Sequence, residues 1–146
     1  MGTNSGAAAG QAGSVAASAA TAERVLALVN LERLRVGCPA VHEHPALERA
    51  AERHSAEMAT GGRLTHMGRG GVSVGERLHD SGYENEYYGE NVARGSQNAP
   101  SVVRSWMNSP DHREIILTCT YREAGVGISH GPDGPWWTFI LGAAHA

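Results

Sequence analysis

A glutamate inside an apolar stretch is the first residue of this sequence whose chemistry needs a partner. Glu90 lies in "YGENVARG", next to Asn91 and directly before the apolar pair Val92 and Ala93. A carboxylate beside a buried strand is costly unless hydrogen bonds or an opposite charge satisfy it. Two interpretations stay open: Glu90 ties the strand to backbone N–H groups, or it faces the side chains of a site.

Histidines with defined surroundings are the next candidates. His54 shares the face of an expected helix with apolar residues at helical spacing, so we interpret it as a packed, hydrogen-bonded side chain rather than a ligand. "HEH", residues 42–44, could chelate a metal, but its place in a loop before Pro45 favours a solvated turn. The face of His54 contains Leu47, Ala50, Ala51, His54 and Met58.

Helix signals occupy the first half and the middle of the chain. Thr21 is a candidate N-cap for a helix that Gly37 ends. "HPALERAAERHSAEMATGG" has a first-turn proline and two closing glycines, and Ser73 with Glu76 forms a capping box. Two further short helices are expected after Asn98 and after Ser109. The inward positions predicted for the first helix are Val25, Leu28, Leu31 and Leu34.

Strand signals gather late in the sequence. "EAGVGISH" and "PWWTFILGA" flank the turn signal "GPDG" and predict an antiparallel hairpin, and "GENVAR" predicts a further strand. Helices that precede and cover such strands make an α+β domain with a small antiparallel sheet. Trp136 and Trp137 are neighbours in one strand, so we expect one to point inward and the other outward, where it could contact a ligand.

The bulk properties limit the class of protein. The chain has 146 residues, enough for one domain with a core, and a net charge of −3 that disfavours nucleic acid as a partner. Residues 1–21 are rich in Ala, Gly and Ser and predict a flexible leader, followed by a domain over 22–146. No transmembrane segment is expected, any export signal would lie outside this sequence, and a monomer is expected.

Two cysteines bear on the compartment. Cys38 and Cys119 each follow an expected helix, in "RVGCP" and "LTCTY". They could be two buried thiols, but we favour a disulfide, which would place the protein in an oxidising compartment.

Seven motifs in order resemble one family. "LVNLER", "HSAEMA", "LTHMG", the residues Arg77, Gly82 and Tyr83, "GENVARG", "SPDHR" and "AGVG" are similar to the bacterial branch of the CAP superfamily. These are the cysteine-rich secretory, antigen 5 and pathogenesis-related proteins, or SCP-like extracellular proteins. The resemblance covers about residues 22–142 and implies an α-β-α sandwich. It also implies a Cys38–Cys119 disulfide and a secreted protein.

The resemblance further implies a cleft. The family has a tetrad of two His and two Glu, which maps here onto His66 in "LTHMG", Glu90 in "GEN" and His112 in "SPDHR". The second Glu position, three residues after Trp106, is Ser109 in this chain. Two imidazoles and one carboxylate could hold Zn²⁺ with water in an open position. His66 and His112 could equally be polar groups of a cleft wall that binds nothing.

The function expected on this basis is a binding or interaction module whose cleft takes a divalent metal or a small ligand. Lipids and extracellular protein partners are further possibilities. The alternative is a metal-assisted, peptidase-like hydrolase of an extracellular or cell-wall polymer, with His66, Glu90 and His112 as its catalytic residues. We do not favour an enzyme, because the second carboxylate is missing and no nucleophile motif is present. Arg77 and Arg113 are interpreted as ion-pair partners of nearby carboxylates.

Overall fold

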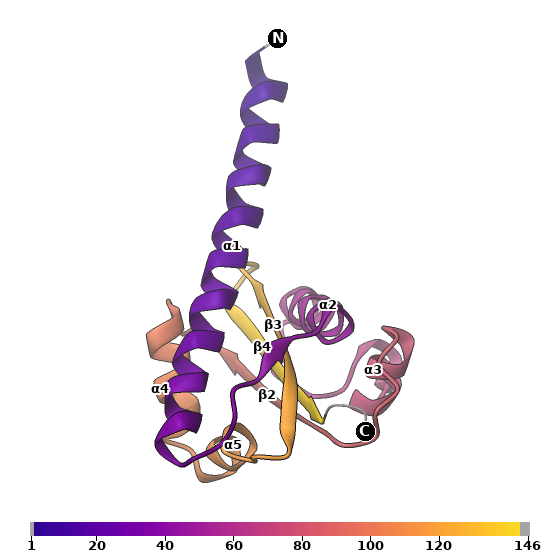
Figure 1. Cartoon of the computed structure of the whole chain (residues 1–146). Helices are drawn as coiled ribbons and strands as arrows, with labels where there is room; N and C mark the ends of the chain where they lie inside the picture. The colour runs from indigo at the N-terminus through magenta and orange to yellow at the C-terminus, as the bar shows by residue number, and fades with distance from the viewer. Residues whose placement is uncertain (1, 144–146) are drawn as a thin grey trace.

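The computed structural model describes the backbone of residues 2–143 and the side chains of residues 18–143. The helices and strands are arranged in three layers (Figure 1). In chain order they are α1 (Gly2–Arg35), β1 (His42–Glu43), α2 (Pro45–Gly61), the 3-10 turn η1 (Arg69–Gly71), α3 (Val74–Asp80), β2 (Tyr88–Arg94), α4 (Ala99–Met107), α5 (Pro110–Ile116), β3 (Tyr121–Ser129) and β4 (Trp136–Ala143).

The four strands form one sheet in the order β1-β3-β4-β2. β3 and β4 make the expected antiparallel hairpin, and β2 pairs with β4 in the same sense. The short strand β1 is parallel to β3, so the sheet is mixed rather than purely antiparallel. The predicted α+β class and the α-β-α sandwich are confirmed.

Helices cover both faces of the sheet. Alternate residues of β4 point in opposite directions: Phe139 joins the core under α1, α4 and α5, while Ile140 joins the core under α2 and α3. The expectation that one of two tryptophans points outward is therefore wrong, because Trp136 and Trp137 are both fully buried, on opposite faces. Neither ring is exposed to contact a ligand.

The "AGVG" motif has a packing reason. A Cβ atom at Gly125 or Gly127 would collide with backbone atoms of α2 at Leu47 and Ala51. The two glycines of β3 thus let α2 lie directly on the strand. This close packing fixes the position of the helical layer that contributes those residues of the site that come from the first half of the chain.

The inward face of α1 differs from the predicted one. Val25, Val29 and Arg33 are fully buried, whereas Leu31 and Leu34 are 52% and 71% exposed. Thr21 lies within α1 and is not its first residue. The flexible leader predicted for residues 1–21 falls largely outside the described side chains and stays a prediction.

The two cysteines form the predicted Cys38–Cys119 disulfide. The buried Arg33 guanidinium joins the same two segments without a carboxylate partner among the described residues, and its pKa is lowered by burial. It donates hydrogen bonds to the carbonyl oxygens of Pro39, Ile116, Thr118 and Tyr121.

Candidate functional site

The candidate site is built on the edge strand β2. Glu90 pairs in register with Ile140 and so faces the α2–α3 layer, while its neighbour Asn91 pairs with Phe139 and faces α4 and α5. The Glu90 side chain is only 2% exposed. One strand therefore sends a carboxylate into one layer and an amide into the other.

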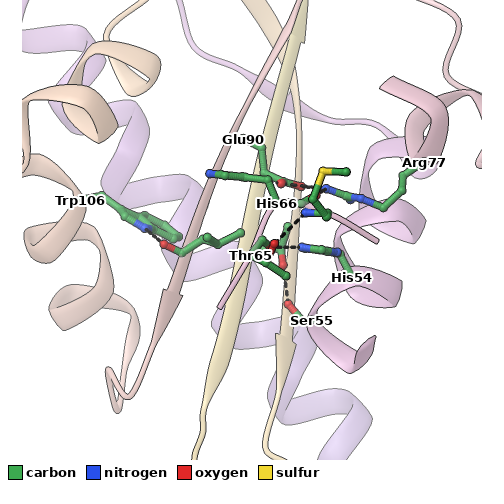
Figure 2. A network of polar contacts seen from close by, with 10 residues as sticks. His54, Ser55, Thr65, His66, Arg77, Glu90 and Trp106 are labelled. Atoms are coloured by element: carbon green, nitrogen blue, oxygen red, sulfur yellow. Dashed lines mark hydrogen bonds and ion pairs between the residues drawn. The ribbon is translucent and has the colours of Figure 1, made fainter. Parts of the chain in front are cut away.

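Glu90 has two partners, and both are side chains of the layer it faces. His66 Nδ1 lies 2.8 Å from Glu90 Oε1, and Arg77 Nη2 lies 2.8 Å and 2.7 Å from Oε1 and Oε2. The same Nη2 donates to the His66 carbonyl oxygen at 2.8 Å. Figure 2 shows the three side chains meeting beside the sheet. The interpretation of Arg77 as an ion-pair partner of a nearby carboxylate agrees with this geometry.

The loop that carries His66 is held by two side chains from outside it and by one hydrogen bond within it. His54 Nε2 lies 2.6 Å from the Thr65 carbonyl oxygen, Arg77 binds the His66 carbonyl, and Met67 N donates to Thr65 Oγ1 at 3.1 Å. His54 is 1% exposed, and burial lowers its pKa, which favours the neutral ring. It is the packed, hydrogen-bonded histidine that the helical pattern predicts.

These contacts fix the chemical state of His66. An ionised carboxylate can only accept hydrogen bonds, so His66 Nδ1 carries a proton and donates the hydrogen bond to Glu90. The other ring nitrogen, Nε2, takes no part in this bond. The His66 side chain is 51% exposed, in contrast to the enclosed Glu90. The hydrogen bond from Nδ1 to Glu90 raises the pKa of His66 above its ordinary value, against the opposing effect of partial burial. The site thus presents one oriented, partly solvated imidazole.

His112 approaches from the opposite layer. It lies in the first turn of α5, and its carbonyl oxygen accepts a 3.0 Å hydrogen bond from Asn91 Nδ2. Its half-buried side chain makes no hydrogen bond or ion pair with His66 or Glu90 in the described structure. Ser109, at the position of the missing second carboxylate, is the N-cap residue of α5 without a side-chain capping bond. The structure brings His66 and Glu90 together, and the His112 backbone contacts Asn91 from the layer on the other side of the strand.

A metal would meet a restricted set of donors here. Within the described part of the chain, no group of three or more His, Cys, Asp and Glu side chains is arranged to hold a metal ion. Both Glu90 oxygens accept hydrogen bonds from Arg77, and Oε1 also accepts one from His66, so a metal would compete with these partners for Glu90. The donors that remain are His66 Nε2 and the His112 ring. Metal-ligating histidines usually donate their second nitrogen to a carboxylate, as His66 does.

Two features of the site were not predicted from the sequence, namely the central position of Arg77 and the role of Gly68 in making room for it. Arg77 was recognised as an ion-pair residue but not as the centre of the cluster. Gly68 offers a signal, because a Cβ atom there would lie 2.8 Å from Arg77 Cδ, so the glycine of "LTHMG" makes room for that side chain. The expected carboxylate partner of Arg113 is absent among the described residues, where its side chain donates to the Met107 carbonyl.

Comparison with known proteins identifies relatives of bacterial origin. Residues 26–141 match the CAP family, described as the cysteine-rich secretory protein family. An uncharacterized membrane protein of Bacillus subtilis, YlbC, is 27% identical over 106 residues, 73% of this chain and 31% of its own length. The uncharacterized protein YkwD of the same organism is 29% identical over 116 residues, 80% of this chain and 44% of its own. The chain thus spans less than half the length of these relatives.

Solved structures share the fold. An extracellular protein with an SCP domain from Bacillus anthracis superposes with a TM-score of 0.81 at 21% identity, covering 87% of this chain and 41% of that one. An outer surface protein of Borrelia burgdorferi gives 0.76 at 18% identity, covering 83% of this chain and 90% of that one. None of the helices in the described part of the chain is long and apolar enough to cross a bilayer. Since the family match extends over most of the sequence, the chain belongs to the CAP family of cysteine-rich secretory proteins.

Proposed function

We propose that this protein is an extracellular binding module whose ligand, a small polar molecule or a divalent metal such as Zn²⁺, is held at the His66 imidazole. The observation that carries the proposal is the state of this ring. Glu90 locks it through Nδ1, while the side chain is 51% exposed. A ring held in one orientation loses little freedom on binding, which favours affinity. The disulfide is consistent with export to an oxidising compartment.

A metal at this place would be held by the His66 and His112 rings, with Glu90 orienting His66 rather than ligating. When bound, Zn²⁺ would supply Lewis acidity and an activated water. The chain's own contribution would be to keep His66 in the tautomer that leaves Nε2 available, and Arg77 would keep Glu90 in place.

The Arg77 ion pair also favours binding over turnover. Both Glu90 oxygens accept hydrogen bonds from Arg77, Oε1 also accepts one from His66, and the side chain is only 2% exposed, so Glu90 is poorly placed to abstract a proton from a substrate. The second candidate is hydrolysis of an extracellular polymer with His66 as general base, because a histidine oriented by a carboxylate is also the arrangement of many hydrolases.

Zinc titration of the purified protein at neutral pH tests the proposal, with heat and histidine NMR signals as readouts. We expect one-to-one binding that His66→Ala abolishes and His112→Ala weakens at least tenfold. His130→Ala, which removes an exposed histidine of the β3–β4 turn, is the matched control and should bind as the wild type does.

Binding that survives His66→Ala would refute a metal at this site, and "HEH" at residues 42–44 would then be the next place to examine. If no zinc binds at all, screening of small polar molecules, lipids and extracellular proteins decides whether His66 contacts another ligand. Turnover of a cell-wall polymer that is lost in His66→Ala would establish the hydrolase instead.

A further inference from the structure

A groove on the other side of the His66 loop is not used by the site described above. It has a volume of about 510 Å³, within the usual range of small-molecule sites. Its walls are the last turn of α2, residues 63–68 and η1. Thr65 and Met67 line it, whereas His66 between them turns to Glu90. His66, Glu90 and His112 are not among the residues that line it.

The wall of the groove is already ordered. Gly62 N and Arg63 N both donate to the Met58 carbonyl at the end of α2, at 2.8 Å and 3.3 Å. Gly71 N donates to the Gly68 carbonyl at 3.0 Å, which closes η1. Together with the contact that holds Thr65, these bonds order the backbone at the end of α2, at Thr65 and at η1, which lowers the entropic cost of binding a ligand there.

Glycines leave the groove open. A Cβ atom at Gly61, Gly70 or Gly71 would have no other protein atom within 4 Å. Gly70 and Gly71 have φ of 75° and 82°, which side chains other than glycine adopt only with strain. The wall at Gly70 and Gly71 is therefore bare backbone, and a ligand can approach it closely.

The side chains of the groove indicate the chemistry of its ligand. Arg63 and Arg69 are exposed, and neither side chain has an ion pair or hydrogen bond among the described residues. Met67, which is 49% exposed, provides thioether surface beside them, and such a side chain adapts to apolar groups of varied shape. The acidic residue of the wall, Glu57, is paired with Arg53 at 3.4 Å and leaves the other two guanidinium groups uncompensated.

We propose that this groove binds a small anionic molecule, whose carboxylate or phosphate contacts Arg63 and Arg69 and whose apolar part lies against Met67. Arginine is suited to both anions because its planar guanidinium can bind two oxygens at once. The site is separate from the one at His66.

Hexanoate is the first probe, because it combines a carboxylate with an apolar tail. In a ¹H–¹⁵N NMR titration we expect saturable shifts at the amides of Gly61, Thr65, Met67 and Gly71. Acetate should bind at least tenfold more weakly, since it lacks the methylene groups that bury apolar surface. Hexylamine, with a similar tail and the opposite charge, should leave these amides unchanged. Comparison with hexyl phosphate then shows which anion is preferred.

Two variants keep the test independent of folding. Arg63→Gln/Arg69→Gln should weaken hexanoate binding at least tenfold, whereas Arg24→Gln/Arg122→Gln, which changes the net charge equally at two exposed sites, should not. Gly61→Leu fits the helix without a clash and should also weaken binding by narrowing the groove. Shifts outside the groove, equal binding of hexylamine, or unchanged affinity in Arg63→Gln/Arg69→Gln would overturn the proposal.

Discussion

Replacing Glu90 by Gln removes a negative charge from a side chain that is only 2% exposed and accepts bonds from Arg77 and His66. The loss leaves the Arg77 guanidinium, whose side chain is 9% exposed, without a charged partner. Two of its nitrogens, Nε and Nη1, already lack hydrogen-bond partners within the described structure. We therefore expect Arg77 to carry most of the cost of the substitution.

Removing one partner of a buried ion pair typically costs about 3–5 kcal/mol. The Gln amide oxygen can still accept one bond from Arg77 Nη2, so we expect the lower end, about 3 kcal/mol of the free energy of unfolding. With a urea m-value of about 2 kcal/mol/M, the unfolding midpoint should fall by about 1.5 M. Urea unfolding at pH 7, followed by circular dichroism, measures this.

Two controls test whether the loss of stability comes from the buried ion pair or from replacing a glutamate by glutamine as such. Glu86→Gln makes the same replacement at an exposed residue that has no ion pair within the described structure, and it should change stability by less than about 0.5 kcal/mol. Arg77→Met combined with Glu90→Gln should be less destabilising than the sum of the two single variants, with a coupling energy of at least about 1 kcal/mol. A loss below about 1 kcal/mol for Glu90→Gln, or additive single variants, would refute the reasoning.

Three further predictions concern the disulfide, the buried arginine and the pH dependence. Cys38→Ser/Cys119→Ser should lose about 4.5 kcal/mol in the chain-entropy estimate for a separation of 81 residues, measured by chemical unfolding against the oxidised wild type; a loss under about 1 kcal/mol would contradict that estimate. Arg33→Lys cannot reproduce the forked bonds to four carbonyls and should cost at least about 2 kcal/mol in thermal and urea unfolding; wild-type stability would show that the contacts are dispensable. Because Glu90 raises the pKa of His66, the protonated ring stabilises the fold below about pH 6.5, and this contribution is lost as pH rises through the folded pKa. NMR titration should show that the His66 pKa falls in Glu90→Gln, and an unchanged pKa would mean that Glu90 does not cause the shift.

The boundaries of the helices after α1 and the hairpin could be predicted because their signals are local, whereas the start predicted for α1 at Thr21 was wrong. Caps, first-turn prolines and the "GPDG" turn act within a few residues, and the structure confirms the elements that they predicted. The inward face of α1 was wrong for a geometric reason. Steps of three residues rotate by about 60° less than a full turn, so Val25 and Leu34 lie on opposite sides of the helix.

The buried face of α1 follows Val25, Val29 and Arg33 instead. An arginine in that row looks like a polar position in the sequence. Its burial depends on carbonyl oxygens of residues up to 88 positions away, which no local pattern reveals. The same limit applied to Trp136 and Trp137, because the alternation of a strand does not tell whether helices cover one face of a sheet or both.

The site was predictable as a set of residues but not as an arrangement. The motifs located His66 and Glu90, which the structure places in contact. They could not show that Glu90 is enclosed by Arg77, nor that the His112 backbone contacts Asn91 from the opposite layer, because both depend on how the layers meet at the sheet edge. The metal role of the three residues stays a prediction.

The burial of the Glu90–Arg77 pair is better explained by its role in orienting the His66 ring than by a contribution to the stability of the fold. Replacing a buried ion pair with apolar residues of similar size is often neutral or stabilising, so such a pair is a weak reason for a fold to be stable. An apolar pair would, however, leave the His66 ring without an acceptor for Nδ1 and its carbonyl without the Arg77 donor. The ring would then be free to rotate, and Nε2 would no longer be presented in one direction. The buried charges of Glu90 and Arg77 therefore orient the half-exposed His66 imidazole, which is the part of the site that a ligand can reach.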